Sequence, residues 1–164
     1  KNVFVWGRNF MKAQLIAEQF DQQNFKVIAI ENYIETISHV DIVSCATLSK
    51  EPLVFGKLLK EGQHLDLVGA YKKDMREADD DTIKKASVFV DTFQGGLKES
   101  GDIVIPIING TLNKEDIKAD LFQLCSNKKT GRTSDSEITL FKSVGHALED
   151  LVAATYYFDK YTNE

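Results

Sequence analysis

Short apolar runs rich in β-branched residues recur along the first half of the chain. Between most of them, apolar residues repeat with the spacing of one helix face, as Ala13, Ile16, Ala17 and Phe20 do within residues 11–20. Strands that alternate with helices form parallel βαβ units, so the pattern predicts an α/β fold with a doubly wound parallel sheet. The predicted strands are residues 2–6, 26–30, 41–47, 64–70 and 87–92, and the shorter predicted helices are residues 33–38, 54–59 and 80–86.

The pattern changes after residue 92. Residues 93–117 are rich in loop-forming residues, and residues 114–125 have the composition of a helix. Further on, Ser134 and Glu137 have the S-x-x-E spacing of a capping box, so we expect a first helical turn there, followed by a long helix that contains Gly145. A glycine inside a helix costs about 1 kcal/mol relative to alanine, so this one needs a reason.

Composition limits the possible partners. The chain has 164 residues, 43% of them hydrophobic, which is enough for one domain, and a formal net charge of -5. Basic residues cluster only in pairs, which argues against a nucleic-acid partner, and no apolar run is long enough to cross a membrane. Two widely separated cysteines favour a cytoplasmic location. Because the chain starts at Lys1 directly on a strand, we expect it to be a piece of a longer protein.

Sequence motifs for metal binding and for nucleophilic catalysis are missing. His39, His64 and His146 show no HxxxH or HExxH spacing, and neither Cys45 nor Cys125 belongs to a CxxC pair. There is no GxSxG motif and no Cys/His signature. The candidate site residues are therefore sought where ligands of open α/β sheets bind, after the carboxyl ends of the predicted strands.

Three polar residues follow the first predicted strand. In a dinucleotide-binding sheet, an acidic residue just after the second strand pairs with the ribose 2'-hydroxyl, whereas an arginine accommodates a 2'-phosphate. Arg8 can make a charge-assisted contact to phosphate, Asn9 can cap the next helix, and Lys12 lies one turn further on. The alternative is that Arg8 is an ordinary surface residue of a βα turn.

Two further strand ends carry candidate ligand-binding residues. Ligands of open α/β sheets bind outside the carboxyl ends of the strands. Thr47 and Ser49 follow one strand, and Val68, Gly69 and Ala70 end the next. Small residues let a planar ring approach the backbone, although ordinary strand-to-loop turns have the same composition.

Long blocks of the sequence resemble the carboxy-terminal half of the ornithine cyclodeaminase/mu-crystallin family. They are "DIVSCATLSKEPLVFGKLLKEGQHLDLVGAYKKDMREADDDTIKKASVFVD", "GGLKESGDI" and "GRTSDSEITLFKSVGHALEDLVAA". The resemblance implies a protein that binds NAD(H) or NADP(H) and acts on a small amino or imino acid, with a Rossmann domain that follows a substrate and dimerisation domain. It also implies a homodimer, and it places the first Rossmann strand and its glycine-rich fingerprint outside these residues.

The resemblance also assigns roles to individual residues. Ser143, Val144 and Gly145 are expected where the nicotinamide end of the cofactor meets the substrate, so that the missing side chain of Gly145 lets a ring approach the backbone. The alternative is that Gly145 serves close packing between helices. At the fourth-strand block, cyclodeaminases of the family resemble "VGAD", whereas this sequence has Tyr71, and a phenol is a poor base at neutral pH.

Together these features predict a reductase of a cyclic imino acid, such as pyrroline-2-carboxylate or piperideine-2-carboxylate. NADP(H) is the expected preferred cofactor because of Arg8, with NAD(H) as the alternative. Two other functions remain open, namely an ornithine cyclodeaminase and a non-catalytic mu-crystallin-like NADP(H)-binding protein.

The resemblance divides the chain into two parts. Residues 1–142 are expected to form a partial Rossmann domain, and residues 143–164 a helix that returns toward the substrate and dimerisation domain. In the strand order 3-2-1-4-5-6, residues 2–6 and 41–47 would flank the missing first strand. We therefore expect these two runs either to leave a vacant slot or to pair with each other.

Overall fold

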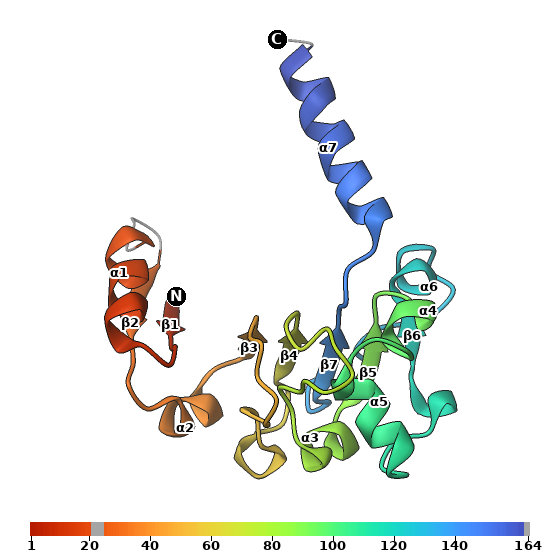
Figure 1. The fold of residues 1–164 in the computed structure, drawn as a ribbon, viewed down its shortest axis with the longest axis horizontal. Coiled ribbons are helices and arrows are strands. Elements are labelled where there is room, and N and C mark those ends of the chain that lie inside the picture. The colour runs from red at the N-terminus through yellow and green to blue at the C-terminus, as the bar shows by residue number, and fades with distance from the viewer. Residues whose placement is uncertain (21–24, 163–164) are drawn as a thin grey trace. The chain divides into compact units, whose positions relative to one another are not determined.

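The computed structural model describes residues 1–20 and 25–162. The chain forms two compact units, Lys1–Val40 and Asp41–Glu164, and each is described by itself (Figure 1).

The first unit is a small βαβ unit. Strands β1 (Asn2–Val5) and β2 (Lys26–Ala29) pair in parallel, with Val3 opposite Val27, and helix α1 (Phe10–Phe20) connects them through residues outside the described range. Ala13 and Ala17 of α1 are buried, which confirms the apolar stripe seen in the sequence. Asn32 caps α2 (Tyr33–Thr36), and a 3-10 turn, η1 (Ile37–His39), ends the unit.

The second unit is built on a parallel sheet of five strands in the order β3-β4-β7-β5-β6. These strands are β3 (Ile42–Cys45), β4 (His64–Leu67), β5 (Ser87–Val90), β6 (Ala119–Asp120) and β7 (Thr139–Lys142). The connecting helices and turns are η2 (Gly56–Leu58), α3 (Asp80–Lys85), α4 (Phe93–Gly96), α5 (Gly101–Ile108), η3 (Lys114–Asp116) and α6 (Leu121–Cys125), and α7 (Ala147–Thr162) follows β7.

One face of this sheet forms the core of the second unit. Alternate residues of a strand point to opposite faces, so Leu65 and Leu67 of β4 share a face with Leu140 and Lys142 of β7, and all four are fully buried. Helix α5 covers this face, because Lys142 reaches its residue Asp102. The core therefore lies between the sheet and α5.

The structure confirms the α/β class and the five strands predicted from the apolar runs. In the expected strand order 3-2-1-4-5-6, residues 64–70 and 87–92 would be the fifth and sixth strands and therefore neighbours. This is wrong, because β7 lies between β4 and β5 and pairs with both. The helical turn expected from Ser134 is also wrong. Ile138–Phe141 is an apolar run that the sheet takes up as a central strand, and the Glu137 carboxylate instead accepts hydrogen bonds from the backbone N–H and the hydroxyl of Thr133.

Two predicted helices and one segment predicted to be loop-rich also differ from the structure. Residues 54–59 form a bridge from Val54 to Ala78 and a 3-10 turn, not an α-helix. Residues 114–125 contain η3, β6 and the short α6 instead of one helix. Residues 93–117, expected to be loop-rich, contain α4 and the almost wholly apolar α5, which the Ser100 side chain caps and which is buried at residues 101–103 and 106. A helix that is apolar on all sides has no helical periodicity for a sequence pattern to show.

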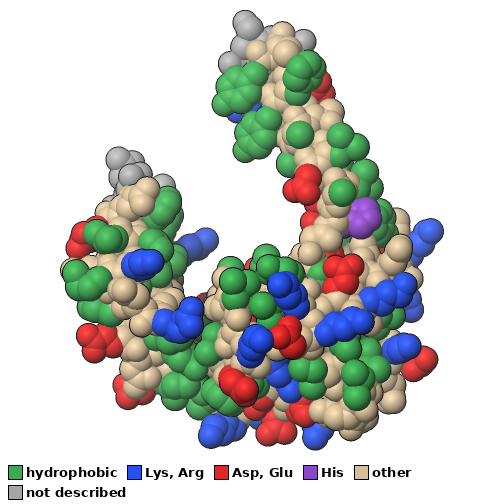
Figure 2. All heavy atoms as spheres, in the orientation of Figure 1, with side chains coloured by type: hydrophobic (Ala, Val, Ile, Leu, Met, Phe, Trp, Pro, Cys, Tyr) green, Lys and Arg blue, Asp and Glu red, His purple; other side chains and the backbone are tan. Residues whose placement is uncertain are grey.

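The C-terminal helix starts later than predicted. It begins at Ala147 instead of residue 143, and residues 163–164 lie outside the described range. No described side chain of α7 is buried, and apolar side chains are visible along it in Figure 2. The most exposed large ones are Val152, Tyr156, Phe158 and Tyr161.

The two runs expected to flank the missing strand do not pair with each other. Among the described residues, β1 pairs only with β2 and β3 pairs only with β4. Of the two alternatives for these runs, pairing with each other is therefore wrong. Ile42 of β3 is 64% exposed, and Val3 of β1 is 43% exposed, so both runs keep apolar surface uncovered.

Candidate functional site

The predicted site residues of the second unit lie at one edge of its sheet. All five strands are parallel, so the segments that follow β3, β4, β5 and β7 leave the sheet at the same edge. Backbone hydrogen bonds join two of these segments, since Ala70 N–H donates to Thr47 O at 2.8 Å and Arg76 N–H donates to Ser49 O at 3.0 Å. The structure therefore brings together the strand ends that the sequence pointed to.

Asp91 organises the segment after β7. Its Oδ2 accepts hydrogen bonds from the Ser143 hydroxyl at 3.1 Å, from Val144 N–H at 2.7 Å and from Gly145 N–H at 2.8 Å. The side chain of Asp91, at the end of β5, is almost completely buried. One carboxylate oxygen thus fixes the three residues predicted to meet the nicotinamide. Sequence reasoning missed Asp91, although an acidic residue directly after the apolar run "VFV" was a usable signal.

Gly145 lies in this segment and not inside a helix. Its φ of +87° is a left-handed conformation that L side chains rarely adopt, which explains the glycine. No heavy atom lies within 4 Å of the position a Cβ would take, so the alternative reason for this glycine, close packing between helices, is wrong. The open side of Gly145 has room for a ligand atom.

Gly69 and Ala70 are buried residues of the segment after β4. A Cβ on Gly69 would overlap the Thr47 backbone and the Glu77 carboxylate. Ala70 has a positive φ of 48°, and its carbonyl accepts a hydrogen bond from Ser100 at 2.8 Å. Gly69 is therefore small because β3 and β4 approach closely here. Only the neighbours Val68 and Tyr71 present side chains to solvent, at 48% and 47% exposure.

The side chains of Thr47 and Ser49 take part in the turn after β3. Thr47 Oγ1 accepts from Ser49 N–H at 3.3 Å, and the Ser49 hydroxyl donates to Glu51 O at 2.6 Å. Both residues are half-buried. Their hydrogen bonds set the direction in which the chain leaves the sheet.

A cluster of three buried charges lies beneath this edge. Lys142, Glu77 and Asp102 are each completely buried. The Lys142 ammonium donates a hydrogen bond to Gly69 O and lies 3.4 Å from Asp102 Oδ2 and 4.0 Å from Glu77 Oε2. Burial raises the pKa of both carboxyl groups, because removal from water disfavours the charged form. No sequence motif indicated this cluster, since its members are far apart in the chain.

The first unit contains the other predicted site residues. Asn9 Oδ1 accepts a hydrogen bond from Lys12 N–H at 3.1 Å, which confirms the predicted cap of α1. Arg8 and Lys12 are exposed at the start of this helix. The charges expected to contact a phosphate are therefore open to solvent within their own unit.

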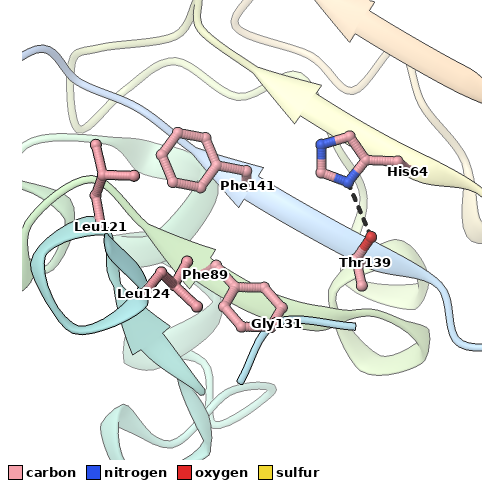
Figure 3. Close-up of a pocket in the computed structure, with 7 residues that line it drawn as sticks. All are labelled: His64, Phe89, Leu121, Leu124, Gly131, Thr139 and Phe141. Carbon is pink, nitrogen blue, oxygen red and sulfur yellow. Dashed lines mark hydrogen bonds between the residues drawn. The ribbon is translucent and has the colours of Figure 1, made fainter. Parts of the chain in front are cut away.

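A separate cavity lies on the face of the sheet opposite Lys142, because Thr139 and Phe141, which line it, alternate with Leu140 and Lys142 along β7 (Figure 3). It has a volume of about 330 Å³ and includes the first residues of β4 and β7, His64 and Thr139, which are hydrogen-bonded at 2.8 Å. Burial lowers the pKa of His64. The other lining residues are Phe89, Leu121, Leu124, Gly131 and Phe141.

The described residues contain neither a candidate metal site nor a candidate membrane span. Across residues 1–20 and 25–162, no three His, Cys, Asp or Glu side chains are grouped so that they could hold a metal ion. Within the same ranges, every helix is too short or too polar to span a bilayer.

A sequence profile of the ornithine cyclodeaminase/mu-crystallin family matches residues 1–164. The chain belongs to this family. Delta(1)-pyrroline-2-carboxylate reductase of Paracoccus denitrificans is 36% identical over 156 residues, which cover 95% of this chain and 49% of the relative. Ketimine reductase mu-crystallin of Rattus norvegicus is 34% identical, over 99% of this chain and 48% of the relative.

Solved structures of similar proteins agree with the family assignment. Delta(1)-pyrroline-2-carboxylate reductase of Thermococcus litoralis, solved with NADH and L-proline, has a TM-score of 0.94 and 35% identity, over 99% of this chain and 51% of that one. An archaeal alanine dehydrogenase dimer with bound NAD has a TM-score of 0.86 and 26% identity, over 94% of this chain and 47% of that one. The chain thus spans about half the length of these family members and has their Rossmann-type fold.

Proposed function

We propose that the intact protein is a reductase of a cyclic imino acid, such as pyrroline-2-carboxylate or piperideine-2-carboxylate, that prefers NADPH. Tyr71 is the observation that favours this function over the other activities of the family. It follows Ala70 at the carboxyl end of β4, is half exposed, and stands where cyclodeaminases of the family resemble aspartate. A tyrosine can donate a hydrogen bond but is a poor base for deamination.

The geometry of the edge fits a dinucleotide. Gly145 leaves open space on its Cβ side, and Asp91 holds its backbone in place. In this proposal Ser143, Val144 and Gly145 frame the nicotinamide and the substrate, together with Val68, Gly69 and Ala70. Because Gly69 and Ala70 are buried, they act by shaping the backbone, and Val68 presents the side chain.

The remaining roles follow the resemblance to the family, with Thr47 and Ser49 in the second unit and Arg8, Asn9 and Lys12 in the first. Thr47 and Ser49 line the adenosine side, while Arg8, Asn9 and Lys12 receive the 2'-phosphate. The reduced nicotinamide, when bound, supplies a hydride to the imine carbon. The residues of this chain orient the ring, and Tyr71 is placed to hydrogen-bond near the reacting end.

The preference for NADPH rests on Arg8. In a titration of the intact protein with both cofactors, NADPH should bind about tenfold or more tightly than NADH, because a charge-assisted contact contributes about 1.5 to 3 kcal/mol. Arg8→Ala should abolish the difference, whereas Lys129→Ala, which removes an exposed charge in the second unit, should not. Equal affinities in the unmodified protein would contradict the preference.

The proposed activity is tested by offering both kinds of substrate. Cyclic imino acids should consume NADPH, and ornithine with NAD should release little or no ammonia. Rapid ammonia release would support an ornithine cyclodeaminase, and cofactor binding without turnover of either substrate would support a non-catalytic NADP(H)-binding protein.

The proposed whole protein is a homodimer in which α7 returns toward a substrate and dimerisation domain. The exposed apolar side chains of α7, among them Leu151 and Phe158, support this arrangement because water-exposed apolar surface is unfavourable. Sedimentation of the intact protein should give twice the mass of one chain, and a monomer would contradict this.

A further inference from the structure

The buried cluster of Lys142, Glu77 and Asp102 connects several segments of the candidate site. Lys142 is the last residue of β7, and Ser143 follows it directly. The Lys142 ammonium donates to Gly69 O at the end of β4. A single side chain therefore links the segment after β7 to the segment after β4.

The two carboxylates extend this connection to the remaining segments. Glu77 Oε1 accepts from Thr47 N–H at 2.6 Å, after β3. Asp102 Oδ1 accepts from Glu77 N–H at 2.7 Å and from Ala78 N–H at 3.0 Å, which fixes Glu77 to the start of α5. Each carboxylate thus uses one oxygen to hold backbone and turns the other toward Lys142.

The second oxygen of each carboxylate is balanced by the charge of Lys142. Among the described residues, Glu77 Oε2 and Asp102 Oδ2 have no hydrogen-bond partner, and Lys142 is the cation paired with both. Leaving a buried charge without its partner is strongly destabilising, whereas replacing a whole buried ion group by neutral side chains of similar size is often tolerated. This difference allows the role of the ammonium to be separated from the packing of the core.

We propose that Lys142 is a positioning residue of the candidate site: its ammonium group fixes Gly69 directly and Thr47 through Glu77, and so sets the strand-end segments that receive the dinucleotide. The inference rests on the proposed function. It adds a residue that touches neither cofactor nor substrate and acts through the backbone of the segments that do.

The decisive variant is the triple substitution Lys142→Met, Glu77→Gln and Asp102→Asn in the intact protein. It removes the three charges but keeps carbonyl oxygens that can accept from Thr47, Glu77 and Ala78. We expect it to fold, to bind NADPH more weakly by on the order of 10- to 100-fold, and to raise KM for NADPH more than it lowers kcat. Amide hydrogen exchange at Ala70 should become faster.

The single variant Lys142→Met leaves two uncompensated carboxylates. Its NADPH binding should be weak at neutral pH and should recover in part as the pH is lowered, because burial raises the pKa of Glu77 and of Asp102 and protonation neutralises them. Cys45 also faces the cluster, and burial raises its pKa to about 12, so it stays protonated throughout. The triple variant should show no such recovery.

Lys85→Met is the matched control. Lys85 also donates to a backbone carbonyl, Gly56 O at 2.6 Å, but beside α3 and η2, away from the carboxyl edge. It should bind NADPH like the unmodified protein. A triple variant that binds NADPH and exchanges at Ala70 like the unmodified protein, or that cannot fold at all, overturns the inference. If the unmodified protein binds no NADPH, the proposed function fails, and the exchange at Ala70 still tests the positioning role.

Discussion

Asp91→Asn should loosen the segment Ser143–Gly145 without dismantling the sheet. In the unmodified protein, Asp91 Oδ2 accepts from three donors of this segment, and Oδ1 accepts from Thr92 N–H at 2.6 Å. An asparagine has one acceptor oxygen. If that oxygen serves the segment, its amide group faces Thr92 N–H, and a buried donor loses its partner.

The magnitude follows from the loss of charge and of one acceptor. An unsatisfied buried donor costs about 1 to 3 kcal/mol, and hydrogen bonds to a charged group are stronger than neutral ones by about 1 kcal/mol. The free energy of unfolding should therefore fall by about 2 to 4 kcal/mol, since these contributions do not add fully. Ser143→Ala is the control, because it removes one donor to Asp91 and the longer of two acceptors of Gly145 N–H, at 3.2 Å, but keeps the carboxylate at 2.8 Å, and it should cost about 1 kcal/mol.

Urea unfolding of the intact protein measures the stability of both variants, and amide hydrogen exchange at Val144 and Gly145 measures the local effect. Asp91→Asn should speed the exchange of both amides, whereas Ser143→Ala should change it little. If the two variants lose the same small stability and exchange at the same rate, Asp91 does not organise this segment.

Three further predictions concern single positions. In urea unfolding, Gly69→Ala should lower the free energy of unfolding by about 1 to 3 kcal/mol or more, because the added Cβ would overlap the Thr47 backbone. The control Gly131→Ala has open space around the added Cβ and should change the free energy of unfolding by no more than about 0.5 kcal/mol. Equal effects would contradict the close approach of β3 and β4. In the same assay, Gly145→Ala should lower the free energy of unfolding by about 1 to 2 kcal/mol because of the positive φ, and Gly145→Asn should lower it by less. If neither variant changes the free energy of unfolding, the backbone of this segment adapts to a side chain. Glu137 should titrate in NMR with a pKa of about 2, because hydrogen bonds from Ser87 and Thr133 favour its charged form. Its contribution to the free energy of unfolding is then present above the ordinary carboxyl pKa and is lost as the pH falls toward 2. Titration near 4.5, the ordinary value, would refute this.

Local sequence signals were enough for strands β1 to β5 and for α1. Residues 2–6 and 64–70 are rich in apolar and β-branched residues and are bounded by polar residues, so their local pattern agrees with their place in parallel sheets. Asn9 was predicted as a helix cap because capping depends only on residues three positions away.

Strand β7 and helix α5 could not be found in this way. Thr139–Lys142 is a strand because β4 and β5 pair with it on both sides, and this tertiary pairing overrides the local capping signal at Ser134. Helix α5 is apolar almost all round and contains Pro106, so its sequence lacks the alternation of apolar and polar residues that marks a surface helix.

For the candidate site, too, one part could be predicted from the sequence and another part could not. Its edge followed from where the strands end, but the groups that hold the edge came only from the structure. Lys142 and Gly69 are 73 residues apart, and Glu77 and Asp102 are 25 residues apart. The available signal was an ionisable residue adjoining an apolar strand run, as at Asp91 and Lys142, since a buried charge requires a partner.

The most direct test of the proposed reductase is to follow the transferred hydrogen. The intact protein is incubated with pyrroline-2-carboxylate and NADPH that carries deuterium at the transferable position of the nicotinamide, and the proline formed is analysed by mass spectrometry and NMR. The proposed function predicts proline with one deuterium on its α-carbon, formed faster with NADPH than with NADH. Absence of proline, or proline without deuterium, would contradict hydride transfer to a cyclic imine.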